Sequence, residues 1–261
     1  MASYQDYLLH LADNALILGQ RNAEWCGHGP ILEEDLALAN NSLDLIGQAR
    51  LLYQHVATVR KDGKSSEDLL AYFRDVQDFK NYTLLELPHR NAALPTSTGD
   101  RDYAITIGRN FLYSALMVQA WAALAASTDA QLAAIASKSL KEVQYHLRHA
   151  HDWVLRLGDG TDESHRRMQA AFDYLLPFTQ EFWTASAMET AAVKTGAGID
   201  VTAFKAEWDA VVSATLQAAT LKVSASTGFI TTGKHGVHSE HLGFVLAEMQ
   251  SLARAHPEAV W

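Results

Sequence analysis

The chain has 261 residues, and 48% of them are apolar, so it can bury a substantial core. Its formal net charge of −9 argues against nucleic acid or an anionic membrane surface as a partner. No run is long and apolar enough to predict a membrane span, and the N-terminus lacks the pattern of a signal peptide. A single cysteine, Cys26, permits no disulfide within the chain. We therefore expect a cytoplasmic protein in which Cys26 is buried rather than nucleophilic.

The first half of the sequence predicts two long helices joined by a short link. Residues 4–22 carry apolar side chains at helical spacing, and residues 31–59 form the most informative stretch. Three carboxylates follow Pro30, where the helix dipole favours negative charge. The apolar residues of this second helix form two stripes: Leu32, Leu36, Ala39, Leu43 and Ile46 on one face, and Leu38, Leu45 and Leu52 on another. Two stripes predict a helix packed on several sides, with Asp44 inside and in need of a partner or a chemical role.

The rest of the chain also reads as helix, with few chain breakers. Ser66, Asp129 and Ser239 are predicted N-caps, and Asp100 or Asp102 opens a long helix. The remaining predictions are a helix from about 75 to 88, a loop at 91–99, helices at 102–127 and 129–157, a helix over 161–188 kinked at Pro177, a linker at 194–201, and helices at 202–221 and 239–256. The four long helices predict an all-α four-helix bundle with additional helices. No change of composition divides residues 1–261, so we expect a single domain.

A long bundle with interior carboxylates raises the question of a di-iron centre. That chemistry requires a glutamate from each of two helices and Glu-x-x-His from each of the other two. The pattern occurs once, at Glu86 to His89, with a proline inside it, and a looser Asp162 to His165 lies at a helix start. On the long helices, Asp44 is followed three residues later by Gly47, and His146 is preceded by Val143. The sequence therefore predicts no metal centre and no cofactor in this chain.

Two further clusters leave other functions open. His235, His238 and His241 recur at steps of three and could bind zinc in a self-sufficient metalloenzyme, although an ordered loop and cap network explains them as well. The loop containing Arg60, Lys61 and Lys64 could contact the phosphates of a CoA ester, although most such loops are simply solvated. We find no phosphate-binding glycine loop and no nucleophile with an adjacent base.

Several blocks resemble the C-subunit family of bacterial phenylacetyl-CoA ring-1,2-epoxidases. They are EWCGHGP at 24–30, DLALAN at 35–40, LDLIGQAR at 43–50, KE at 141–142, YHL at 145–147, GKHGVH at 233–238, EHLG at 240–243 and AEMQ at 247–250. The likeness extends from about residue 11 to residue 261. It implies a ferritin-like bundle whose paralogue, the catalytic A-type subunit, carries the di-iron centre and binds the CoA thioester. It also implies a separate reductase that supplies electrons, and a structural, non-catalytic role for this chain.

The resemblance also implies where the metal ligands have been lost. Asp44 and Gly47 fall where a glutamate and a histidine would be, and Val143 and His146 fall at the second such motif, with Asn14 and Ser114 near the remaining carboxylates. We expect Asp44 and His146 to be satisfied by hydrogen bonds or by a direct pair. The nearest interior polar candidates are Gln48, Arg50, Glu142 and Tyr145. The expected partner is the A-type subunit, and a homodimer remains open.

Overall fold

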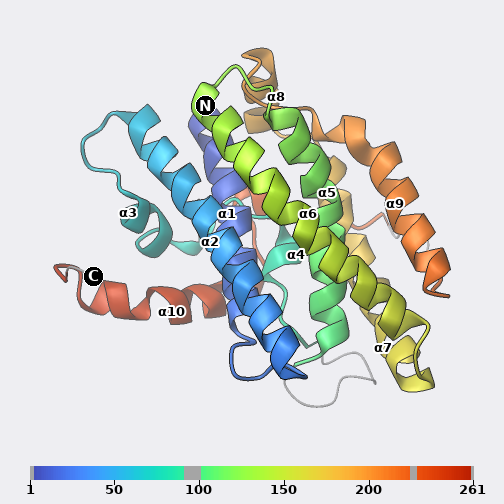
Figure 1. Cartoon of the computed structure of the whole chain (residues 1–261). Coiled ribbons are helices and arrows are strands. Elements are labelled where there is room, and N and C mark those ends of the chain that lie inside the picture. The colour runs from blue at the N-terminus through green and yellow to red at the C-terminus, as the bar shows by residue number, and fades with distance from the viewer. Residues whose placement is uncertain (1–2, 91–100, 224–227, 260–261) are drawn as a thin grey trace.

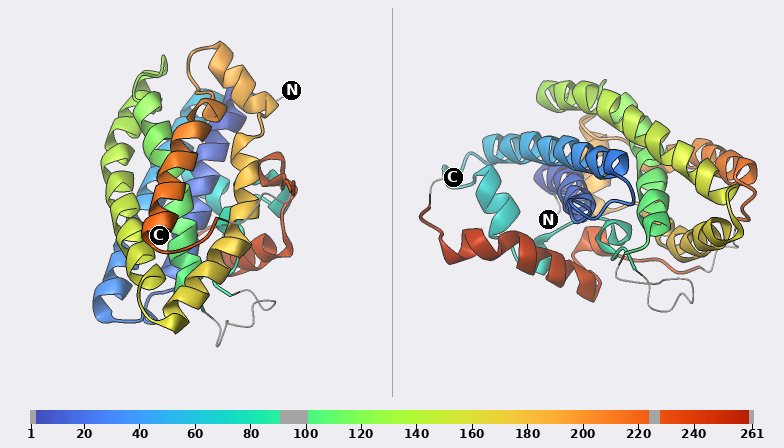
Figure 2. Two further views of the ribbon diagram at one scale, coloured as in Figure 1. Left: turned by 90° about the vertical axis from the view of Figure 1, so that its right-hand side faces the viewer. Right: turned by 60° about the horizontal axis from the view of Figure 1, so that its bottom comes forward.

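The computed structural model describes residues 3–90, 101–223 and 228–259, and these residues contain helices and one isolated bridge between Thr232 and Val237. Four long helices form the centre: α1 (Tyr4–Ala23), α2 (Leu32–Arg60), α5 (Tyr103–Leu124) and α6 (Ala130–Gly158). α1 packs mainly on α2, and α5 packs mainly on α6. As a result α2 and α6 form a layer over α1 and α5 (Figures 1 and 2). The predicted all-α, ferritin-like four-helix bundle is confirmed.

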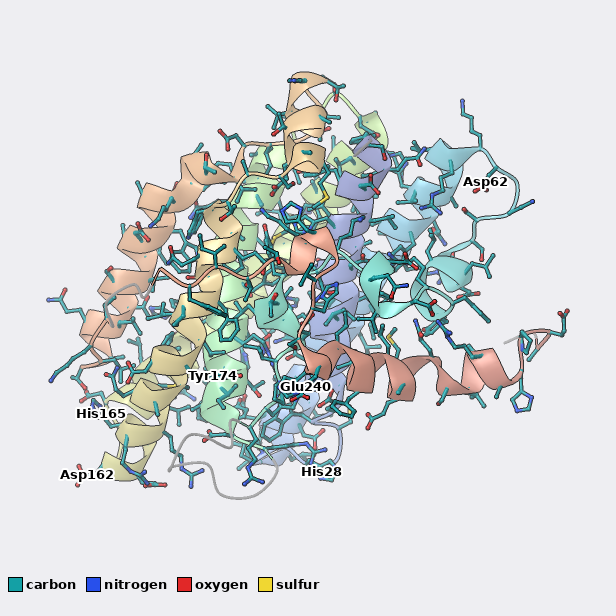
Figure 3. The ribbon with its side chains drawn as sticks, turned by 180° about the vertical axis from the view of Figure 1, so that it is seen from behind. His28, Asp62, Asp162, His165, Tyr174 and Glu240 are labelled. Carbon is teal, nitrogen blue, oxygen red and sulfur yellow. The ribbon has the colours of Figure 1, made fainter. Side chains whose placement is uncertain are left out.

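Shorter helices surround this centre. They are α3 (Glu67–Tyr72), α4 (Thr83–Glu86), α7 (Asp162–Leu175), α8 (Ala187–Lys194), α9 (Lys205–Ala218) and α10 (Glu240–Ala255). α7 and α9 pack beside α5 and α6, whereas α10 contacts α3 and α4 at the opposite side of the bundle (Figure 1). Figure 3 shows this arrangement from behind, with Glu240 at the start of α10 and Asp162 at the start of α7.

The predicted helix caps are present. Ser66 accepts a hydrogen bond from the Leu69 amide at 3.1 Å, Asp129 accepts from the amides of Gln131 and Leu132 at 3.0 Å, and Ser239 accepts from the His241 amide at 3.3 Å. Asp102, rather than Asp100, caps α5. Each cap satisfies an amide that has no partner inside its helix, which is why these helices begin where the sequence indicates.

Three predicted helices were wrong in extent. Residues 75–88 form only a 3₁₀ turn (Val76–Asp78) and the four-residue α4. The amides of Lys80, Tyr82 and Thr83 donate to side chains from elsewhere in the chain and not to the backbone. Around Pro177 the chain continues as a 3₁₀ segment (Leu176–Trp183). α8 is a separate helix that begins at its own capping box, formed by Ser186 and Glu189. A short 3₁₀ segment (Val201–Phe204) precedes α9. The loop expected at 91–99 lies outside the described residues.

The surroundings of α2 differ from the sequence prediction. The stripe of Leu38, Leu45 and Leu52 is buried in the core, as expected. The leucines of the other stripe are exposed, so only one of the two stripes is core, although α2 does pack on several sides, against α1, α6 and α3. α1 and α2 approach closely at Gly19, where a Cβ would lie 3.2 Å from Ile46 and 3.3 Å from Leu45. Cys26 is also exposed, contrary to expectation, because the link buries its neighbour Trp25 instead.

Candidate functional site

The α2–α6 interface carries a row of polar contacts, which makes it the first candidate site. The two helices are antiparallel, so positions that rise along α2 meet positions that fall along α6. Four pairs form the row: Glu34 with His149 at 2.8 Å, Asp44 with His146 at 3.0 Å, Gln48 with Glu142 at 2.9 Å, and His55 with Asp129 at 2.7 Å. In three of these four pairs an imidazole contacts a carboxylate. Within each pair, the two side chains satisfy each other's polar atoms.

Asp44 and His146, the pair expected from the sequence, contact each other directly. His146 Nε2 lies 3.0 Å from the Asp44 carboxylate, and the histidine is buried while the Asp44 side chain is 38% exposed. Asp44 is therefore at the rim of the interface and not in the interior, which corrects the sequence prediction. A partly solvent-exposed carboxylate that also contacts an imidazole is stable without a metal ion.

The four neighbouring polar candidates separate into two groups. Gln48 is buried, and its amide donates to Glu142, which also receives Lys138 at 3.2 Å. Arg50 and Tyr145 were wrong as interior residues: Arg50 is exposed and pairs with Glu67, and Tyr145 is exposed and stacks on His149. Helical rotation explains this, because these two positions lie on the outward sides of α2 and α6.

The donor set around Asp44 and His146 does not fit a di-iron centre. Gly47 offers no side chain, and Val143 is an apolar core residue. On α1, Asn14 is already used, since its side-chain oxygen accepts the Tyr82 amide at 2.8 Å. Across the described residues, no group of three or more histidine, cysteine, aspartate and glutamate side chains is arranged to hold a metal ion.

The two Glu-x-x-His-like patterns also serve structural roles. Glu86 and His89 have different partners: Glu86 receives His238, while His89 Nε2 lies 2.7 Å from the carbonyl oxygen of Arg21. His165 Nδ1 lies 2.6 Å from the Gly158 carbonyl oxygen and thus ties the start of α7 to the end of α6. His165 and Asp162 lie in the first turn of α7, at the outer end of that helix (Figure 3).

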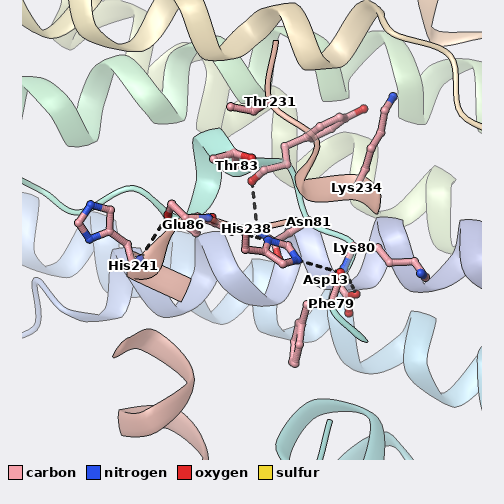
Figure 4. A network of polar contacts seen from close by, with 12 residues as sticks. Asp13, Phe79, Lys80, Asn81, Thr83, Glu86, Thr231, Lys234, His238 and His241 are labelled. Atoms are coloured by element: carbon pink, nitrogen blue, oxygen red, sulfur yellow. Dashed lines mark hydrogen bonds and ion pairs between the residues drawn. The ribbon is translucent and has the colours of Figure 1, made fainter. Parts of the chain in front are cut away.

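Among the three histidines near the C-terminus, His238 belongs to a buried hydrogen-bond network (Figure 4). His238 Nδ1 lies 2.8 Å from the Glu86 carboxylate, and its Nε2 lies 2.9 Å from the Phe79 carbonyl oxygen. Both neighbours are acceptors, so both ring nitrogens donate and the ring is an imidazolium. His238 therefore has no lone pair for a metal, and His235 is exposed elsewhere on the segment. The structure does not assemble a zinc site from His235, His238 and His241.

Two buried carboxylates attach the segment Thr231–Ser239, here called the C-terminal strap, to the bundle. Glu86 also accepts the Ser239 amide at 2.6 Å. Glu181 accepts the Lys234 amide and the Thr231 hydroxyl, both at 2.8 Å, and the Thr83 amide at 2.9 Å. The Lys234 ammonium group pairs with Glu189 at 2.9 Å inside the core.

Gly233 is required in the C-terminal strap, because a Cβ would lie 2.5 Å from the Asn81 carbonyl oxygen. The ordered loop and cap network that the sequence left open for this segment is present. The buried carboxylates that hold it were not predicted, although two glycines beside a lysine indicate close backbone approach.

The protonation of His238 predicts a specific pH dependence. Burial by itself lowers the pKa of His238, but the hydrogen bond and charge of Glu86 and the Phe79 carbonyl oxygen outweigh it, so its pKa is raised above 6.5. Because the folded state holds this proton more tightly than the unfolded state, the resulting stability is full below pH 6.5 and is lost as the pH rises through the folded-state pKa.

We therefore expect the free energy of unfolding of the wild type to fall from pH 6.5 upward, and this component to vanish in His238→Gln. Urea unfolding over a pH series measures it. His256→Gln, at an exposed histidine, serves as the control and retains the wild-type slope. An unchanged slope in His238→Gln would show that the ring is neutral in the folded state.

The basic loop after α2 is closed by its own carboxylate. Asp62 closes the loop by accepting the amides of Lys64 and Ser65 at 2.9 and 2.8 Å. Hydrogen bonds from Ser65 and Lys64 lower the pKa of Asp62 to about 2, so a permanent negative charge lies among the cations. Arg60 also contacts Ser65, so the groups of this loop are occupied by one another.

Comparison with known proteins gives these features a context. A family model described as phenylacetic acid catabolic protein matches residues 2–261. The chain belongs to this family. It is 44% identical over 255 residues to the C-type subunit of the 1,2-phenylacetyl-CoA epoxidase of Escherichia coli (strain K12), and the match covers 98% of each chain. The resemblance found in the sequence blocks is confirmed, and membership of the phenylacetic acid catabolic family connects the chain with phenylacetate catabolism. Among the described residues, no helix is both long and apolar enough to cross a membrane.

Proposed function

We propose that this chain is a structural, non-catalytic subunit of a multicomponent monooxygenase that epoxidises the ring of phenylacetyl-CoA. In this proposal it works in the cytoplasm and supports an A-type subunit that carries the di-iron centre. The relative in Escherichia coli is named as one subunit of such an epoxidase, and a subunit functions with others.

One observation carries the proposal. At the α2–α6 interface, Asp44 and His146 satisfy each other at 3.0 Å, and the positions that would complete a ligand set hold Gly47 and Val143. Two side chains, one of them aspartate in place of glutamate, fall short of the six ligands of a carboxylate di-iron centre. The place of that centre is thus a degenerate site that now contributes to packing between helices.

Metal analysis of the purified chain tests this proposal. We expect iron far below one atom per chain after expression in iron-supplemented medium and purification without chelators, and no epoxidation of phenylacetyl-CoA by the chain with its reductase alone. Adding the A-type subunit restores activity, and the same mixture without this chain is the control. Stoichiometric iron with activity in the isolated chain would overturn the proposal.

The competing metalloenzyme interpretation has its own test. The substitution His241→Ala removes a candidate zinc ligand and leaves the buried pair of His238 and Glu86 unchanged. A metalloenzyme loses bound zinc and activity in this variant, whereas the structural subunit keeps both its fold and its ability to support the A-type subunit.

A further inference from the structure

Three aromatic rings contact one another edge to face where α5 begins. Tyr103, the first residue of α5, lies between Trp153 of α6 and Trp25 of the link before α2. The ring centroids are 5.4 Å apart for Tyr103 and Trp153 and 5.5 Å apart for Tyr103 and Trp25. Edge-to-face contact is a favourable packing of aromatic rings. It also has a chemical consequence, because tyrosine and tryptophan lose an electron most readily among the aromatic side chains, and an electron passes quickly between rings in contact.

Two of these rings line a cleft that the packing of the helices leaves open. The cleft has a volume of about 300 Å³ and is lined by Trp153 and Tyr103 together with apolar side chains such as Ile31 and Leu157. Trp153 and Tyr103 are both only partly buried. Small solutes can therefore enter the cleft and reach the two rings.

The hydroxyl group of Tyr103 has the partner that one-electron oxidation of a phenol requires. It donates to the Glu34 carboxylate at 2.5 Å, and Glu34 is itself buried and lies 2.8 Å from His149 Nε2. Burial and the hydrogen bond and charge of Glu34 raise the pKa of Tyr103, so the phenol holds its proton in the resting protein. A phenol that has lost an electron is a strong acid, and its proton can then pass along this hydrogen bond to Glu34.

The charges around the three rings favour removal of the electron from Tyr103 over the two tryptophans. The Arg156 guanidinium lies over the Trp153 ring, with Cζ 5.3 Å from the centroid. The Trp25 indole and the buried Arg109 guanidinium contact the same imidazole nitrogen, at 3.2 and 3.0 Å. A nearby cation disfavours positive charge on an indole ring, whereas the carboxylate beside Tyr103 favours loss of an electron from the phenol.

Tyr53 shows that a carboxylate partner alone does not make such a site. Its hydroxyl group also donates to a carboxylate, that of Asp13, at 2.5 Å. However, the Arg74 guanidinium lies 5.5 Å over the Tyr53 ring and donates to the same hydroxyl group at 3.1 Å. This cation opposes oxidation of Tyr53. Tyr103 combines a carboxylate acceptor with tryptophan neighbours and with access from the cleft.

We propose that Tyr103 is a redox-active residue that reduces small oxygen-centred radicals in the cleft by way of Trp153. The radical takes one electron from Trp153 and leaves as the corresponding anion. Tyr103 then gives an electron to the Trp153 radical cation and its proton to Glu34, which leaves a neutral tyrosyl radical. A soluble one-electron reductant of the ascorbate class restores the phenol, and the proton returns from Glu34. This activity goes beyond the proposed structural role and does not depend on it.

Flash photolysis of the purified chain with a ruthenium(III) polypyridyl oxidant tests the proposal. The radical is identified by electron paramagnetic resonance, and its formation is followed by transient absorption. We expect a neutral tyrosyl radical in the wild type and tryptophan radicals instead in Tyr103→Phe. In Glu34→Gln the tyrosyl radical forms about tenfold more slowly or worse, because the hydrogen bond to a charged acceptor is lost.

Two further tyrosines provide matched controls. Tyr4 also donates to a carboxylate, that of Asp129 at 2.8 Å, but its aromatic neighbour is Tyr7 and not a tryptophan. Tyr145 is exposed and is directly accessible to the oxidant. We expect Tyr4→Phe and Tyr145→Phe to give the tyrosyl radical with the yield of the wild type.

A second measurement tests the protective effect itself. The wild type and Tyr103→Phe are exposed to hydroxyl radicals in the presence of ascorbate, and oxidation of Trp153 is measured by mass spectrometry. We expect Trp153 to be oxidised several-fold faster in Tyr103→Phe. Equal oxidation of Trp153 in the two proteins would overturn the proposal.

Other outcomes of the flash experiment also count against it. A tyrosyl radical that persists unchanged in Tyr103→Phe would place the radical on another residue, and tryptophan radicals alone in the wild type would show that Tyr103 gives up no electron. Melting curves establish that each variant is folded. If a variant is not, the wild type in D₂O decides: slower formation of the tyrosyl radical than in H₂O supports coupled transfer of the proton to Glu34, and an equal rate contradicts it.

Discussion

Replacing Glu86 by glutamine should lower the free energy of unfolding by about 3 to 5 kcal/mol, because it breaks a buried charge pair and leaves the other charge unpaired. Glu86 is fully buried and receives three donors, from His238, Asn81 and the Ser239 amide, at 2.8, 2.9 and 2.6 Å. A glutamine amide group turns one acceptor into a donor, so at least one of these groups faces another donor. The His238 imidazolium also loses its counter-charge.

Urea unfolding followed by circular dichroism measures this change at a pH below 6.5, where His238 is charged. Glu163→Gln is the matched control, since Glu163 pairs with Arg166 and Arg167 on the exposed surface of α7. Pairs between fully exposed side chains contribute little to the free energy of unfolding, because water screens them. A loss for Glu86→Gln no larger than that of the control would show that the C-terminal strap is held by packing and not by this carboxylate.

The change Asp13→Asn should have a comparable effect, again about 3 to 5 kcal/mol. Asp13 lies fully buried on α1 and accepts the Tyr53 hydroxyl at 2.5 Å and the Lys80 amide at 2.8 Å. It also pairs with Arg74, whose Nη1 lies 3.1 Å away. The asparagine cannot accept from all of these donors, and it leaves the Arg74 guanidinium buried without a carboxylate. Losing the Asp13 carboxylate therefore weakens the attachment of α1 to α2 and to the segment before α4.

Thermal and urea unfolding of Asp13→Asn are compared with Asp209→Asn. Asp209 pairs with Lys205 at 2.6 Å on the exposed side of α9, so the same chemical change there should cost about 1 kcal/mol or less. Equal losses in the two variants would contradict a central role for the Asp13 network. A larger loss in Asp13→Asn, with the slope of unfolding against urea unchanged, supports it.

N-cap residues and apolar spacing in the sequence correctly predicted the helices whose ends are set by hydrogen bonds between near neighbours. Ser66, Asp129 and Ser239 are N-caps because their side chains bond amides two or three residues away, and such bonds need nothing from the rest of the chain. The ladder of apolar residues in α5 and α6 is likewise set by helical spacing. The helix predicted over 75–88 failed because amides in it donate to distant side chains, Thr83 to Glu181 and Tyr82 to Asn14. The helix predicted over 161–188 is instead divided by a 3₁₀ segment that contains Pro177 and by the capping box of α8.

The candidate site shows the same division. The prediction that Asp44 and His146 lack the companions of a di-iron centre rests on residue type and spacing, which can be counted along the sequence. The partners of each side chain could not be read in this way. Two of the contacts, Glu34 with His149 and Glu86 with His238, join residues more than a hundred positions apart. The sequence around one residue of such a pair does not indicate which distant residue is its partner.

The sequence by itself determined the class of this protein, since composition, caps and apolar periodicity specify a helical bundle and the motif blocks specify its family. Only the tertiary structure decided which stripe of α2 is core and which is surface. Periodicity places Leu36 and Leu38 on different faces of one helix, but it gives no preference between them. The packing of α1 against α2 makes that choice, burying Leu38 and leaving Leu36 outward.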